Sequence, residues 1–141
     1  MIEDTLDWYA QDVDGNVWYL GEDTAEYEDG VVVNTAGSWE AGVDGAQAGI
    51  LVPAAPEVGM TYRQERYAGG GRGRARVLSV NERAEAPYGV FDGCFQTEDT
   101  TPMDSDVLEH KYYCPGAGPV LAIDVAGGGL REELLSFVEG R

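Results

Sequence analysis

The chain has 141 residues, of which 43% are hydrophobic and 10% aromatic, and its formal net charge is −17. This length and composition predict a globular domain with a hydrophobic core rather than a disordered chain, and no apolar run reaches the roughly 18 residues that span a membrane. The negative charge argues against a nucleic-acid partner and an anionic lipid surface, because both are bound by Lys and Arg.

The charge is distributed unevenly along the chain. Residues 1–60 contain 13 Asp and Glu and no Lys or Arg, whereas residues 61–141 contain 13 acidic and 9 basic residues. Such a segment is typical of a metal site, of a surface for a cationic partner, or of a solubilising surface. Residues 1–5 lack the basic-then-apolar order of a signal peptide, so we expect the leader to be absent from this chain.

Short β-branched and aromatic runs alternate with Gly, Pro and Asp-Gly, and helical periodicity is almost absent. We predict strands near residues 6–12, 16–21, 30–36, 38–42, 49–53, 60–68, 74–83, 88–97, 106–114, 119–125 and 130–138. The last segment also fits a helix, but a terminal strand would close an exposed sheet edge. The fold class is all-β: a single domain over 1–141, built as an antiparallel barrel or curved half-barrel of about eight to eleven strands.

The Gly, Pro and Asp-Gly residues between these strands also predict several turns. Asp14-Gly15 and Asp29-Gly30 suit the positive φ angles of tight hairpins. We also expect hairpin tips at the Gly/Arg stretch 69–73 and at residues 127–129.

The first candidate site is a calcium site. Calcium takes six to eight oxygen ligands, and oxygen-bearing side chains alternate around the first glycine turn and continue in the acidic stretch after it: Asp12, Asp14, Asn16, Glu22 and Asp23. An EF-hand is not formed, because Asp23 stands where a bidentate Glu is required. The alternative is that these residues are hairpin-turn chemistry.

The second candidate site is a polar cluster drawn from separate strands. Its predicted ligand-binding residues combine charge and aromatic rings: Trp39, Arg63, Glu65, His110 and Tyr112. Strand alternation places Arg63 and Glu65 on one face, and His110 and Tyr112 on one face. Within a cup, Glu65 and His110 could act as acid/base groups, with Glu40 as a further catalytic candidate. The alternative is a structural Arg–Glu pair and a surface His.

The two cysteines, Cys94 and Cys114, lie on the arms of a predicted hairpin that turns near Met103. A disulfide is geometrically possible across these arms. Two inert thiols, or a Cys nucleophile beside His110, are the alternatives that the sequence leaves open.

Four groups of motifs carry a family resemblance. They are residues 7–12 with 14–19 and 21–24 (DWYAQD, DGNVWY, GEDT), 37–46 (GSWEAGVDGA), 62–65 (YRQE) and 109–113 (EHKYY). On these residues the chain resembles an uncharacterised family of bacterial secreted proteins and lipoproteins, which implies a secreted or envelope-attached protein. Residues 113–120 are loosely similar to a segment of envelope half-barrel proteins that hold apolar ligands. The Gly/Arg stretch 69–76 departs from the family pattern, which is acidic there.

Three function classes follow. The first is an extracytoplasmic, non-enzymatic binding protein that holds a small apolar ligand in a β-cup, calcium in acidic turns, or both. The second is an enzyme that uses Glu65 and His110. The third is a structural or adhesive surface module whose acidic half meets a cationic surface.

Overall fold

A computed structural model describes residues 1–66, 73–101 and 104–140. The described residues form strands and no helix, and so contain no helix that is long and apolar enough to cross a membrane. The strands are β1 (Ile2–Gln11), β2 (Val17–Glu28), β3 (Val31–Asn34), β4 (Trp39–Glu40), β5 (Gln47–Val52), β6 (Thr61–Arg63), β7 (Glu65–Arg66), β8 (Arg74–Ala86), β9 (Gly89–Thr101), β10 (Asp104–Cys114), β11 (Gly118–Asp124) and β12 (Arg131–Glu133).

The strands form two antiparallel sheets, and by their contacts the chain divides into two compact units. The first unit comprises residues 1–54 and 63–72, and the second comprises 55–62 and 73–141. Among the described residues neither sheet closes into a barrel. The all-β antiparallel prediction is therefore confirmed, with open sheets rather than a closed barrel. The single domain over 1–141 stays a prediction.

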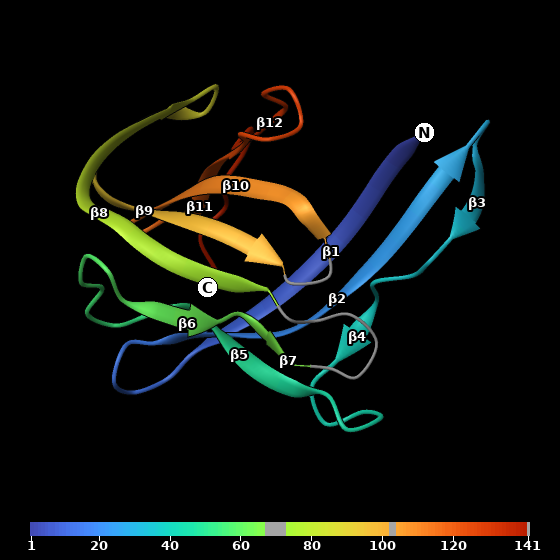
Figure 1. The fold of residues 1–141 in the computed structure, drawn as a ribbon, viewed down its shortest axis with the longest axis horizontal. Coiled ribbons are helices and arrows are strands. Elements are labelled where there is room, and N and C mark those ends of the chain that lie inside the picture. The colour runs from blue at the N-terminus through green and yellow to red at the C-terminus, as the bar shows by residue number, and fades with distance from the viewer. Residues whose placement is uncertain (67–72, 102–103, 141) are drawn as a thin grey trace. The chain divides into compact units, whose positions relative to one another are not determined.

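The first sheet is built around the long strand β2 (Figure 1). One edge of β2 pairs with β1 along its length, from Ile2 opposite Tyr27 to Gln11 opposite Val17. The other edge pairs in turn with β5, β4 and β3, and β5 continues to β7. Within this unit β1 is thus an edge strand.

The second sheet has the order β12-β11-β10-β9-β8-β6. Figure 1 shows β8 and β9 as a long curved hairpin, and their register shifts at three places. Such bulges bend a strand and increase its twist. They account for the curvature of this sheet.

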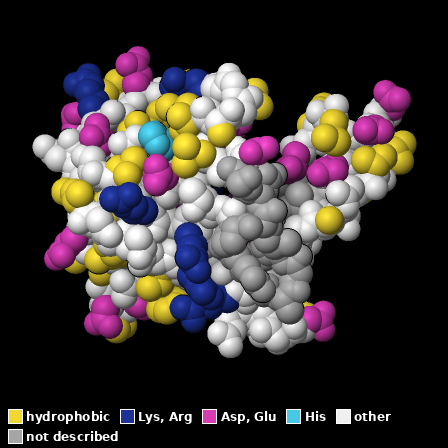
Figure 2. Space-filling model, viewed as in Figure 1, with side chains coloured by type: hydrophobic (Ala, Val, Ile, Leu, Met, Phe, Trp, Pro, Cys, Tyr) yellow, Lys and Arg dark blue, Asp and Glu magenta, His cyan; other side chains and the backbone are white. Residues whose placement is uncertain are grey.

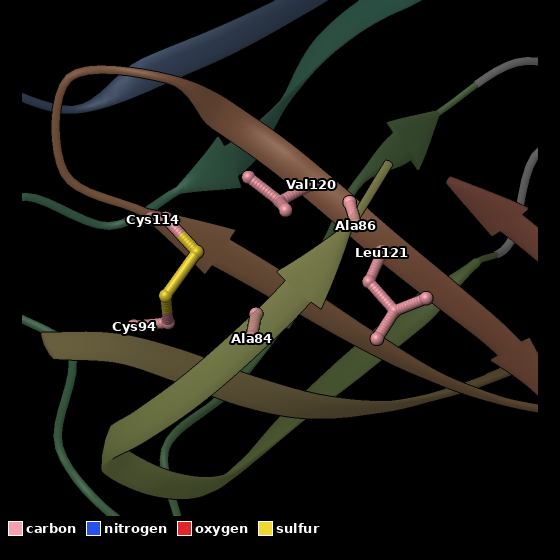
Figure 3. Close-up of a cluster of buried hydrophobic side chains, with 6 residues drawn as sticks. All are labelled: Ala84, Ala86, Cys94, Cys114, Val120 and Leu121. Carbon is pink, nitrogen blue, oxygen red and sulfur yellow. A yellow bond between two sulfur atoms is a disulfide. The ribbon is translucent and has the colours of Figure 1, made fainter. Parts of the chain in front are cut away.

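The disulfide between Cys94 and Cys114 lies in the core of the second unit. Figure 3 shows it beside four other buried residues, Ala84, Ala86, Val120 and Leu121. The cysteines are 0% and 4% exposed, and they come from β9 and β10, the two arms predicted from the sequence. The disulfide prediction is confirmed.

Several predicted boundaries are wrong, each for a physical reason. The acidic stretch 22–28 was expected to be a turn, but it is strand because β1 pairs with one edge and β3 and β4 with the other. The terminal strand covers only Arg131–Glu133, because the chain then anchors Leu134 through backbone hydrogen bonds to Val120 and Tyr88. The predicted tip at 69–73 and the turn near Met103 fall largely or wholly outside the described residues.

Candidate functional site

A pocket of about 680 Å³ lies in the first unit. Its lining residues come from β1, from β2 and from the segment 37–46 that contains β4: Trp8, Glu22, Asp23, Gly37, Ser38, Trp39, Glu40, Val43, Asp44 and Ala46. None of these ten residues is basic, and four are acidic. The pocket is therefore an acidic site with aromatic walls.

Hydrogen bonds to the backbone of β2 hold the segment 37–46 against that strand. The Ser38 hydroxyl accepts from the Thr24 amide at 2.9 Å and donates to the Thr24 carbonyl at 3.2 Å. The Ala41 amide donates to the Leu20 carbonyl at 2.8 Å. Beyond β4 the chain reverses at Asp44-Gly45, where φ is 50° and 80°, the positive values that Asp and Gly tolerate best. The pocket wall is thus fixed at both ends.

The two indole rings of the pocket differ in exposure. Trp39 is 7% exposed and packs edge-on against Tyr19 at 5.2 Å between ring centroids, whereas Trp8 is 37% exposed. Trp8 lies over Gly21, where an added Cβ atom would come within 2.5 Å of both the Trp8 ring and the Trp39 carbonyl oxygen. Gly21 is therefore required for the indole of Trp8 to reach the pocket.

Carboxylates lie side by side next to the pocket. In the strand registers Glu22 stands opposite Asp7 on β1 and opposite Trp39 on β4. Burial, with the nearby charge of Asp7, raises the pKa of Glu22, although the nearby hydroxyls of Tyr19 and Thr24 oppose the shift. The Tyr19 hydroxyl donates to the Asp7 carboxylate at 2.5 Å, and burial and this acceptor raise the pKa of Tyr19 far above its usual range. These carboxylates give this side of the pocket a negative charge.

The structure divides the predicted calcium ligands into two groups. Glu22 and Asp23 lie on β2 at the pocket, whereas Asp12, Asp14 and Asn16 lie in the β1–β2 hairpin turn. At about 3.3 Å per residue along a strand, the two groups are too far apart to ligate one ion. Within the described residues no group of three or more His, Cys, Asp or Glu is arranged to hold a metal. Calcium binding stays a prediction.

Asp12 instead organises its own turn. Its Oδ1 accepts from the amides of Asp14 and Asn16, and its Oδ2 accepts from Asn16 Nδ2 at 3.0 Å and Trp18 Nε1 at 2.8 Å. These hydrogen bonds, first those from Trp18 and Asn16, lower the pKa of Asp12 to about 2. Only Gly15 of the predicted Asp-Gly pair has a positive φ. The geometry is that of a hairpin turn capped by a carboxylate.

The predicted cup residues are distributed over both units. Trp39 and Glu40 line the pocket, whereas Arg63 is exposed, Glu65 half-buried, and neither is among the lining residues. His110 belongs to β10 of the second unit. The catalytic role of Glu65 and His110 stays a prediction.

The expected pairing of His110 with Tyr112 on one face of β10 is found. Gln96 Nε2 bridges the two residues, 2.9 Å from Tyr112 Oη and 3.2 Å from His110 Nδ1. Burial, followed by the charge of Glu82, raises the pKa of Tyr112. This polar group belongs to the strand pair β9–β10.

Six lining residues were not named from the sequence as site residues: Trp8, Gly37, Ser38, Val43, Asp44 and Ala46. Yet every lining residue falls within three of the segments that carry the family resemblance, 7–12, 21–24 and 37–46. The density of Trp, Asp and Glu in those segments was a signal that could have identified the pocket.

Comparisons with protein-family models, curated proteins and solved structures found no match for this chain.

Proposed function

We propose that this chain is a non-enzymatic binding module that holds a small organic cation with an apolar body in the pocket beside β4. The observation that carries the proposal is the lining itself: two Trp and four acidic residues, with no basic residue among them. The sequence analysis predicted a small apolar ligand, and the acidic lining adds that this ligand carries a positive charge.

The physical argument rests on two attractions that act on the same ligand. A cation over an indole face gains about 0.5–2 kcal/mol from the ring quadrupole, and more when water is excluded. Carboxylates add a Coulombic attraction, strengthened where burial lowers the local dielectric. A neutral apolar ligand would gain only the hydrophobic part.

The size and the surroundings of the pocket fit this class of ligand. Ligand pockets measure about 300–1,000 Å³, and this one measures about 680 Å³. The 13 acidic residues among residues 1–60, which include no Lys or Arg, create a negative potential that raises the association rate of cations.

The compartment belongs to the same proposal. Disulfides persist in oxidising compartments and are rare in the cytosol, so the Cys94–Cys114 disulfide supports an extracytoplasmic, secreted or envelope-attached protein.

The proposal is tested by titrating the protein with choline and with its uncharged isostere dimethylbutanol, using tryptophan fluorescence and calorimetry. We expect choline to bind and the isostere to bind much more weakly. Trp8→Ala should weaken choline binding about twofold to thirtyfold, the range that a cation–π contact supplies.

Glu22→Gln tests the carboxylates, and Glu57→Gln is its matched control. Both variants remove one carboxylate, but only Glu22 lines the pocket. Glu22→Gln should weaken binding and Glu57→Gln should not. Equal affinity for choline and its isostere, or an unchanged Kd in Trp8→Ala, would overturn the proposal.

A further inference from the structure

We propose that the outer edge of β1 is a docking edge for an extended partner segment in which basic and apolar residues alternate. This goes beyond the pocket, because the partner is a polypeptide and the contact is the pairing of strands.

The first step is the position of β1. This strand of 10 residues stands at the end of its sheet, and among the described strands it pairs with β2 alone. Thr5 is its only half-buried residue, and all the others are exposed. An edge strand of this length presents unpaired backbone donors and acceptors, the template that strand addition uses.

The second step concerns one face of the β1–β2 pair, which carries a row of acidic and Thr residues that we call the acidic ladder: Glu3 opposite Glu26, Thr5 opposite Thr24, and Asp7 opposite Glu22. The hydroxyls of Thr5 and Thr24 lie 3.2 Å apart, which shows that the ladder shares one face. Like charges directly opposite each other destabilise a strand pair. A row of basic side chains on a third strand would relieve this repulsion.

The third step concerns the opposite face of β1, which carries three large apolar side chains. Ile2, Leu6 and Trp8 alternate with the ladder residues and are 72%, 68% and 37% exposed, and the exposed Asp4 lies between Ile2 and Leu6 on the same face. Figure 2 shows hydrophobic and acidic side chains together, without Lys or Arg, on the end of the arm formed by β1, β2 and β3. A partner strand would extend the apolar stripe on this face and the charged row on the other.

The two faces together define the partner. A strand alternates its side chains between faces, so a segment that alternates basic and apolar residues places its basic residues beside the acidic ladder and its apolar residues beside Ile2, Leu6 and Trp8. A second copy of β1 does not, because its Glu3 and Asp7 would add to the like charge. The edge therefore selects against self-association and for a basic partner.

The test uses the full chain and a fluorescein-labelled octapeptide that alternates Lys and Val. Two controls have the same length: the same residues arranged as a Lys block and a Val block, and a peptide that alternates Glu and Val. We expect anisotropy to show binding of the alternating Lys peptide at least about tenfold tighter than either control, since phase and charge must both match. Hydrogen exchange should slow at β1 amides when it binds.

Protein variants make the test local. Leu6→Lys should weaken peptide binding about tenfold by placing a like charge in the apolar stripe. Val58→Lys adds the same charge at an exposed residue of the second unit and should leave the affinity unchanged. Choline binding is measured in parallel, so that failure of the pocket and failure of the edge are told apart.

Equal binding of the alternating and block Lys peptides, or equal affinities of the two Lys variants, would overturn the proposal. Unchanged exchange at β1 in the peptide complex would do the same.

Discussion

Asp7 and Glu22 stand directly opposite each other on β1 and β2, so two carboxylates share one place on the sheet face. The Tyr19 hydroxyl donates to Asp7, and Glu22 is left with the raised pKa that burial and its neighbour impose. When both carboxylates are ionised, their repulsion therefore lowers the stability of the folded protein. A bound cation would offset that cost.

The first prediction is that Glu22→Gln stabilises the protein near neutral pH. A carboxyl whose folded pKa is raised binds more protons folded than unfolded, so its contribution to stability falls as pH rises above its unfolded pKa. Removing the like charge should raise the free energy of unfolding by about 0.5 kcal/mol. Thermal melts at neutral pH and near pH 4 measure it, with a smaller gain expected at the lower pH.

Glu57→Gln serves as the control for removing one negative charge, because Glu57 is exposed in the second unit. A lower midpoint for Glu22→Gln than for wild type at neutral pH would contradict the prediction.

The second prediction concerns the turn capped by Asp12. Its pKa of about 2, against an ordinary value of 3.8, means that its contribution to stability is present above the unfolded pKa and is lost as pH falls through the folded pKa. Asp12→Asn should lower the melting temperature at pH 7 and flatten its dependence on pH between about 4 and 2. Asp14→Asn, at an exposed position, is the matched control and should change little.

The same melts test calcium. At matched ionic strength, a midpoint that rises with millimolar Ca²⁺ over excess chelator would show that the folded protein binds calcium, because a ligand of the folded state stabilises it. An equal midpoint would leave the residues around Asp12 as a hairpin turn.

Local chemistry made part of this structure predictable. The hairpin at Asp29-Gly30 was predicted from a dipeptide, and the structure has both residues at positive φ. The Cys94–Cys114 disulfide was predicted from cysteines on two adjacent arms. Features of this kind depend on only a few residues, so they can be predicted from a single sequence.

The pocket could not be predicted, because it depends on how β1, β2 and β4 pair, and the sequence alone does not determine that register. Glu22 and Asp23 fell between the predicted strands 16–21 and 30–36. Acidic residues are depleted in strands, and pairing on both edges of β2 overrides that preference. Trp8 was missed because its place over Gly21 follows from a register that shifts between Trp8 and Tyr9. A bulge of this kind changes the side-chain alternation on which sequence interpretation relies.

The third prediction is that the disulfide supplies a large share of the stability of the second unit. It joins residues 20 apart in sequence, a loop whose closure adds about 3 kcal/mol in the chain-entropy model. Cys94→Ala/Cys114→Ala should therefore unfold at a markedly lower denaturant concentration than wild type. Two alkylatable thiols in unreduced, denatured protein would contradict the prediction.

The fourth prediction is that Gly21→Ala disrupts the pocket. The new Cβ would stand 2.5 Å from the Trp39 carbonyl oxygen and from the Trp8 ring, and overpacking of this kind costs about 1–3 kcal/mol. Choline binding should fall with stability, and tryptophan fluorescence should report the displaced rings. Gly89→Ala, where an added Cβ meets nothing within 4 Å, is the control and should behave as wild type.

The last prediction concerns Lys111, which lies among acidic residues on the second sheet. Its Nζ is 3.5 Å from Asp99 Oδ2 and 3.2 Å from Glu109 Oε2, and Thr97 donates to the other Asp99 oxygen at 2.6 Å. Burial alone would lower the pKa of Lys111, but the carboxylates of Asp99 and Glu109 outweigh it and raise the pKa. Lys111 therefore stays protonated and stabilises Asp99, which is 5% exposed.

Lys111→Met keeps the length of the side chain and removes its charge, so it takes a cation away from the buried Asp99 carboxylate. Breaking a fully buried ion pair costs about 3–5 kcal/mol, and because the Lys111 side chain is 32% exposed, we expect a loss of about 2 kcal/mol. Asp99→Asn in the Lys111→Met background should recover part of this loss, since the buried charge is then gone.

Because the pKa of Lys111 is raised, the wild-type advantage should be complete below its unfolded pKa of 10.5 and shrink as pH rises above it. Urea unfolding of the four proteins in this cycle measures the coupling between Lys111 and Asp99. Additive losses, or equal stability of Lys111→Met and wild type at pH 7, would show that this cation does not hold the buried carboxylate.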